Sequence, residues 1–147
     1  MREIKFRAWD KDSNKMIFQH DTNGVLETND YYFSLNEDDV VLLYYNKDYC
    51  DYLVCNAKLM QYIGMEDRYG KKIYEGDILS INGYSYEEPE FSLYGEVKYG
   101  NCGFCIDDKF DYNEPVSLSE IRGSYATIYE VVGNIFENPE LLKDFTE

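Results

Sequence analysis

Residues 73–81 have the sequence IYEGDILSI, which contains the clearest structural signal in the chain. Glycine accepts backbone dihedrals that other residues avoid, so Glu75-Gly76-Asp77 predicts a turn, and the apolar residues after it predict a strand over 77–81. Further strands are expected on both sides, over 59–63, 93–99, 103–106 and 127–132 with 135–136. Turns are expected at 66–71, in the acidic loop 83–89 and at Gly100-Asn101.

The beginning of the chain alternates in polarity, as expected for a strand. One face would hold Ile4, Phe6 and Ala8, and the other Lys5, Arg7 and Trp9. Residues 10–15 have turn chemistry and 16–18 resume the apolar pattern, which predicts a hairpin. Short apolar runs at 31–33, 40–45 and 52–54 have the length of strands, although a helix within 46–56 is an alternative.

These elements predict an all-β protein, mainly many short antiparallel strands, with one short C-terminal helix. The spacing over 73–136 is analogous to that of an SH3-like barrel. Asn138-Pro139-Glu140 supplies a cap, a first-turn proline and an acid for the helix. The expected division is an N-terminal β-hairpin and variable β segment at 1–57 and a β-barrel-like domain at 58–147, and a single compact unit is the alternative.

Charge limits the choice of partner. The 147 residues hold 14 Lys and Arg against 29 Asp and Glu, a net charge of −15. Such a chain repels phosphate backbones, so nucleic acid is not an expected partner. Two interpretations remain open, a solvated acidic surface and an acidic mimic of nucleic acid that occupies a basic protein. No apolar run reaches the ~18 residues of a membrane span, so no membrane partner is expected.

No group of residues predicts catalysis. His20 is the only histidine and has no distinctive serine or cysteine beside it, and no phosphate-cradling glycine loop is present. The 29 carboxylates make adjacent acidic pairs uninformative. We therefore assign no catalytic residue and expect a non-enzymatic protein without a cofactor.

Two groups of residues have some features of a metal site. The four cysteines, Cys50, Cys55, Cys102 and Cys105, have the number for a zinc site, but the last two span an expected hairpin, and free thiols are the simpler expectation. Residues 10–14 begin like a calcium loop, but Lys15 stands where that loop needs glycine. No metal site is expected.

The face that carries Lys5, Arg7 and Trp9 is the candidate binding site, because two cations beside an indole can contact phosphate and stack on a base. The alternative is structural: either cation stacks on Trp9 or pairs with acidic neighbours across the sheet.

Three segments resemble a known family. They are residues 2–10 (REIKFRAWD), residues 59–64 (LMQYIG) followed by Asp67, Gly70, Lys71 and 73–78, and residues 132–142 (VGNIFENPELL). Together they resemble the YopX family of small phage and prophage proteins. The resemblance implies a phage- or prophage-encoded protein that acts in the host bacterial cytoplasm and has no assigned activity. It carries no catalytic or binding residues over to this chain.

The expected function is therefore that of an accessory protein that binds a host or phage protein. The 16 tyrosines support this hypothesis, because tyrosine-rich surfaces are common at protein interfaces. Exposed strand edges also predict a homo-oligomer. The alternative function is a nucleic-acid-associated β-barrel module or an acidic mimic.

Overall fold

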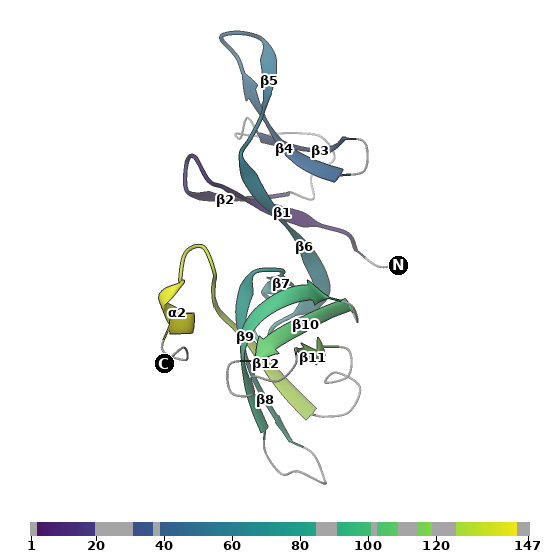
Figure 1. Ribbon diagram of the computed structural model, residues 1–147. Helices are drawn as coiled ribbons and strands as arrows, with labels where there is room; N and C mark the ends of the chain where they lie inside the picture. The colour runs from purple at the N-terminus through teal and green to yellow at the C-terminus, as the bar shows by residue number, and fades with distance from the viewer. Residues whose placement is uncertain are drawn as a thin grey trace. The chain divides into compact units, whose positions relative to one another are not determined.

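The computed structural model describes residues 3–19, 31–36, 39–84, 91–100, 103–108, 115–118 and 126–143. Its strands are β1 (Phe6–Asp10), β2 (Lys15–Phe18), β3 (Tyr31–Asn36), β4 (Asp39–Asn46), β5 (Asp51–Val54), β6 (Ala57–Glu66), β7 (Lys72–Tyr74), β8 (Asp77–Tyr84), β9 (Phe91–Gly100), β10 (Gly103–Asp108), β11 (Val116–Ser117) and β12 (Ala126–Asn134) (Figure 1). The helix α2 covers Glu140–Lys143. The expected class, mainly antiparallel β with one short C-terminal helix, is confirmed, and the SH3-like detail stays a prediction.

The chain divides into two compact units, Glu3–Gln61 and Tyr62–Glu147. Strand β6 contributes to both. Its residues up to Gln61 pair with β1, and Tyr62 and Glu66 pair with β7. The strand therefore runs without interruption through the place where the units divide.

The first unit contains the hairpin predicted over residues 6–18. Strands β1 and β2 pair from Arg7 opposite Phe18 to Asp10 opposite Lys15, and β1 pairs on its other side with β6. A separate three-stranded sheet has the order β3-β4-β5. Among the described residues of the first unit, the most deeply buried apolar side chains are those of Ala8, Leu42 and Met60.

The helix considered within 46–56 is wrong, because a turn and a strand occupy this segment. The Asn46 side chain accepts a hydrogen bond from the Asp48 N–H at 2.9 Å, which favours a turn over a helix. Cys50 has a φ of 50°, in the left-handed region that a right-handed helix excludes. The chain therefore reverses and returns as β5.

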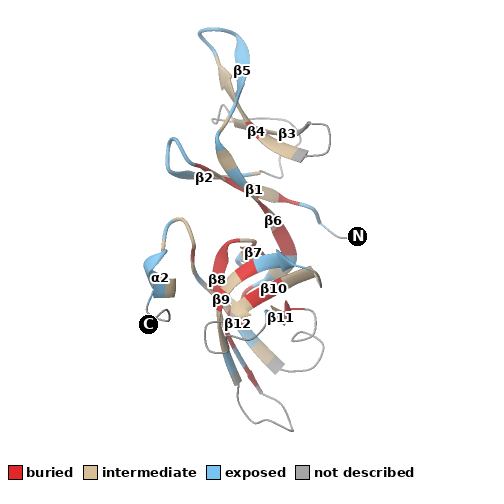
Figure 2. Cartoon of the chain, in the orientation of Figure 1, coloured by how far each residue is buried: buried red, intermediate tan, exposed pale blue. Residues whose placement is uncertain are grey.

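The second unit is built on the five-stranded sheet β11-β10-β9-β8-β12. One apolar cluster packs against this sheet and is coloured as buried in Figure 2. Its buried members are Ile63, Ile73, Leu79, Ile81, Val97, Ile106, Leu118 and Tyr129. Four of these eight side chains come from the segments predicted as strands over 59–63, 77–81 and 103–106. Burial of such large side chains stabilises this unit by about 1.5–3 kcal/mol each before conformational entropy is counted.

The turn at 75–77 is confirmed, and Gly76 is its centre. Gly76 has a φ of 83°, which only glycine adopts readily. Its N–H donates to the Val97 carbonyl and its carbonyl accepts from the Ile135 N–H. Asp77, 1% exposed, accepts the Tyr74 N–H at 2.8 Å. The turn thus connects β7 to β8 while its backbone joins two other parts of the unit.

The C-terminal segment differs slightly from the prediction. Residues 135–137 form a turn and not a strand, because the Asn134 side chain accepts the N–H groups of Phe136 and Glu137. The Asn138 side chain accepts the Asn134 N–H, while its carbonyl accepts the Leu141 N–H at the start of α2. Among the described residues, no helix is long and apolar enough to cross a membrane.

Several predictions fall partly outside the described residues. Of the loop expected at 83–89, Gly83 and Tyr84 belong to β8, and residues 85–89 lie outside the described residues. His20, Asn101 and Cys102 also lie outside.

Candidate interaction surface

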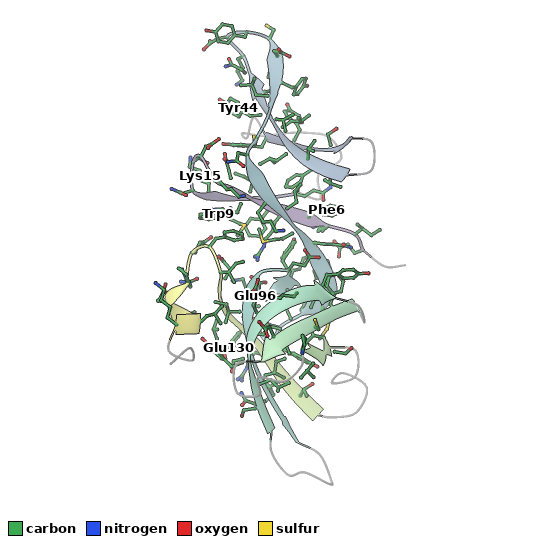
Figure 3. All side chains as sticks on the ribbon, viewed as in Figure 1. Phe6, Trp9, Lys15, Tyr44, Glu96 and Glu130 are labelled. Atoms are coloured by element: carbon green, nitrogen blue, oxygen red, sulfur yellow. The ribbon has the colours of Figure 1, made fainter. Side chains whose placement is uncertain are left out.

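The register of the β3-β4-β5 sheet sorts its side chains into two faces. Phe33 is opposite Leu42, and Tyr31 is opposite Tyr44. Leu42 is 1% exposed, and the Tyr31 hydroxyl donates to the Asp10 carboxylate at 3.2 Å. The rings of Tyr31 and Tyr44, the latter labelled on β4 in Figure 3, have centroids 5.3 Å apart. This face therefore packs into the first unit.

On the opposite face of the same sheet, the register places one charged residue, Asp39, which pairs with Asn36 at the end of β3, and the rest of this face is an uncharged patch. We call it the tyrosine face, and its members are Tyr32, Ser34, Val41, Leu43, Tyr45, Tyr52 and Val54. The Tyr52 ring is 5.5 Å from Tyr32 and 5.0 Å from Tyr45, measured between centroids. Tyr52 is 52% exposed and Val54 68% exposed, and the others are half-buried. Side chains that pack on one another yet remain accessible form a pre-ordered apolar surface.

The sheet of the second unit provides a contrast. There the Lys98 ammonium lies 3.2 Å from Asp107 and 3.5 Å from Glu96, which is labelled on β9 in Figure 3. Burial lowers the pKa of Lys98, but the two carboxylates outweigh it, so the pKa lies above its ordinary value. That sheet offers charge to a partner, whereas the tyrosine face offers aromatic and aliphatic surface.

The predicted binding residues lie elsewhere in the first unit, at and before β1. Lys5 is 8% exposed and Arg7 2% exposed, so neither cation is accessible in the way that contact with a phosphate would require. The Lys5 ammonium is 3.5 Å from the carboxylate of Glu3, which lies two residues earlier on the same segment and not across the sheet. Trp9 is half-buried on β1, opposite Met16 and Lys58 (Figure 3). Their role in binding stays a prediction.

Asp10 organises the turn between β1 and β2. Its carboxylate accepts the Asp12 N–H at 3.1 Å, the Ser13 hydroxyl at 2.9 Å and the Tyr31 hydroxyl. Burial raises the pKa of Asp10, but these hydrogen bonds favour the carboxylate more strongly, so its pKa is below the ordinary value. Burial, together with Asp10, raises the pKa of Tyr31. The residues considered for a calcium loop therefore form a structural turn.

The cysteines and other candidate ligands do not converge within the described residues. Cys50 is exposed, Cys55 is half-buried and Cys105 is buried, and none of the three forms a disulfide. Burial and the nearby Asp10 and Asp12 raise the pKa of Cys55, so a smaller fraction of this thiol is ionised to the reactive thiolate. No group of three or more His, Cys, Asp or Glu residues in this part of the chain could hold a metal ion.

Sequence reasoning missed the tyrosine face because the run 40–45, VVLLYY, has no alternation. Only the strand register shows that Leu43 and Tyr45 share a face with Tyr52. The sequence did contain a signal for this sheet, namely the three apolar runs at 31–33, 40–45 and 52–54. The register in which these runs pair depends on contacts between strands, which the sequence pattern does not show.

Comparisons with known proteins give two results. A family model described as YopX protein matches residues 5–143. A crystal structure of protein EF1440 from Enterococcus faecalis is 22% identical, covers 97% of this chain and 100% of that chain, and has a TM-score of 0.49. No curated protein matches.

Proposed function

We propose, from the premise that this chain belongs to the YopX protein family, that it is a non-enzymatic accessory protein that binds another protein through the tyrosine face. The family resemblance supports a phage or prophage origin and a partner in the host bacterial cytoplasm, which is either a host or a phage protein.

The observation that carries the proposal is the uncharged aromatic patch that forms the tyrosine face, on a chain of net charge −15. The cores of protein interfaces are depleted of charged residues and enriched in tyrosine, and tyrosines supply many of the residues that dominate binding energy. Tyr52 contacts two further rings and keeps about half of its surface accessible. A partner that covers Tyr52 would therefore gain apolar contact with side chains that are already held in place.

The test is a pull-down from host lysate, with and without nuclease, using the tagged protein and two variants. Tyr52→Glu places a charge at the centre of the tyrosine face. Tyr69→Glu is the matched control, because Tyr69 is 71% exposed and lies outside this sheet. We expect a nuclease-resistant partner that Tyr52→Glu loses and Tyr69→Glu retains. Equal retention by both variants would overturn the proposal.

The alternative proposal is a nucleic-acid-associated module. It depends on Lys5 and Arg7, and the burial of both makes it the weaker proposal. The acidic mimic is supported by the net charge alone. Loss of every partner after nuclease treatment would favour the first of these, and retention of a basic nucleic-acid enzyme would favour the second.

A further inference from the structure

Among the described strands, β5 is the outermost of its sheet and is poorly protected. All four of its residues are exposed, as Figure 2 shows, with Leu53 at 54% and Val54 at 68%. Natural proteins commonly protect an edge strand with lysine or proline. Strand β2, an outer strand of the other sheet in this unit, carries the exposed Lys15, whereas β5 has neither residue type.

Two residues of β5, Tyr52 and Val54, direct their backbone N–H and carbonyl groups away from β4. The Cys55 N–H donates to the Leu42 carbonyl at 2.9 Å, and hydrogen-bonded and non-hydrogen-bonded pairs alternate along an antiparallel ladder. Leu53 therefore bonds toward Tyr44 of β4, while the N–H and carbonyl groups of Tyr52 and Val54 point away from the sheet. The Tyr52 N–H donates instead to the Asp51 carboxylate at 2.8 Å, as an outward group should.

We propose that β5 pairs antiparallel with β5 of a second copy of this chain, about a two-fold axis at Leu53. In this register Tyr52 is opposite Val54 of the second copy, and Val54 is opposite the second copy's Tyr52. The two pairs use all four outward groups of each strand. Shifting the axis to Tyr52 would set Val54 against Cys50, whose φ of 50° lies outside the strand region.

Charge and symmetry favour a second copy as the occupant. Asp51 is the only charged residue of β5, and the proposed register places it opposite Cys55 of the second copy, so no like charges face each other. A two-fold axis perpendicular to the sheet also joins the tyrosine faces of both copies on one side. The surface is thus self-complementary, as a two-fold interface requires. The pairing does not depend on the proposed function.

The first experiment is disulfide trapping in full-length protein with the exposed Cys50 replaced by serine. The paired Leu53 residues form a non-hydrogen-bonded pair with Cα atoms about 4.5 Å apart, within the ~4.4–6.8 Å that a disulfide spans. Leu53→Cys should therefore form a covalent dimer under mild oxidation at least tenfold faster than Tyr69→Cys, a control at a position that is more exposed (71% against 54%). Equal rates for the two variants would overturn the proposal.

The second experiment measures mass by analytical ultracentrifugation over a range of concentrations. The wild type should approach twice 17.4 kDa. Val54→Pro removes one outward N–H, a change that an edge strand tolerates, and should be monomeric. Val54→Thr keeps both the N–H and the β-branched shape and should dimerise like the wild type. Circular dichroism verifies that all three proteins fold.

Two outcomes of this measurement would overturn the proposal. One is a Val54→Pro variant that still dimerises. The other is a wild type that is monomeric at every concentration. If that monomer lost its lysate partner on Val54→Pro, the edge would belong to a different protein, while the proposed function would survive. If Tyr52→Glu lost the lysate partner but still dimerised, both proposals would be supported, and partner binding would be shown to be independent of the dimer.

Discussion

Asp67 is a buried carboxylate that fixes one turn to a distant strand. Its side chain accepts the N–H groups of Tyr69 and Lys71, both at 2.9 Å, and that of Val131 on β12 at 3.1 Å. Burial raises the pKa of Asp67, but the three backbone donors and the Lys71 charge favour the ionised form, so the pKa is below its ordinary value. The carboxylate therefore stabilises the fold in its charged state.

Replacing Asp67 should destabilise the protein in a pH-dependent manner. Asp67→Asn weakens the charge-assisted hydrogen bonds, and we expect a loss of about 2 kcal/mol in unfolding free energy at pH 7. Because the folded-state pKa is lowered, this stabilisation is present above the unfolded pKa of 3.8 and is lost as pH falls through the folded value. Urea denaturation at pH 7 and near pH 3 should therefore show the two proteins converging in acid. A constant difference at both pH values would contradict this account.

Gly133 is required for a different reason, which is space. A Cβ atom at this position would lie 2.6 Å from the Asn138 Oδ1 atom, closer than atoms pack. That oxygen also accepts the Asn134 N–H, so it cannot move without losing the bond. The structure thus identifies Asn138 as the neighbour that requires glycine at this position.

Gly133→Ala should therefore destabilise the second unit by about 1–3 kcal/mol through overpacking. Gly100→Ala is the matched control, because its added Cβ would lie 3.5 Å from the Cys105 sulfur, an ordinary contact. The control should leave the thermal midpoint nearly unchanged or raise it slightly. Differential scanning calorimetry of both variants checks the prediction, and an equal loss in the two would show that crowding against Asn138 is not the cause.

Local turn chemistry made several elements predictable from sequence. The β1–β2 hairpin follows from alternation and from the polar residues 10–15, and the turn at 75–77 follows from a glycine with positive φ. The secondary structure of residues 46–56 was ambiguous, because short apolar runs fit a helix or a strand. The positive φ of Cys50, which excludes a helix, is visible only in the structure. The burial of Lys5 and Arg7 likewise breaks the alternation rule, because local pattern does not determine which strand face is covered.

The turn between β1 and β2 is coupled to β3 through Asp10 and Tyr31. We expect Tyr31→Phe to cost about 1 kcal/mol, since it removes one hydrogen bond to a charged group that keeps two others. Asp10→Ala should cost more, because all three donors lose their acceptor. In a double-mutant cycle the two losses should be less than additive by about 0.5–1 kcal/mol. Strict additivity would show that the bond between Tyr31 and Asp10 contributes nothing to stability.

On the scale of the whole molecule, charge opposes self-association while local chemistry favours it. Residues 16–57, which include β3, β4 and β5, hold one basic and eight acidic side chains. Two copies brought together therefore repel, and the uncharged tyrosine face and the β5 edge are where that repulsion is weakest. The sequence revealed the total charge at once, but the location of an uncharged face required the register of the sheet.

This opposition predicts how association responds to salt. The Debye length falls from about 10 Å at 0.1 M salt to about 3 Å at 1 M, so added salt screens the repulsion between copies and leaves backbone hydrogen bonds and apolar contacts nearly intact. The dimer dissociation constant should therefore fall as salt rises, which is opposite to the behaviour of a protein held to a phosphate backbone. Sedimentation of the wild type at low and high salt measures this, with Val54→Pro expected to remain monomeric at both. Weaker association at high salt would mean that ion pairs hold the copies together, and the β5 edge would then not be the interface.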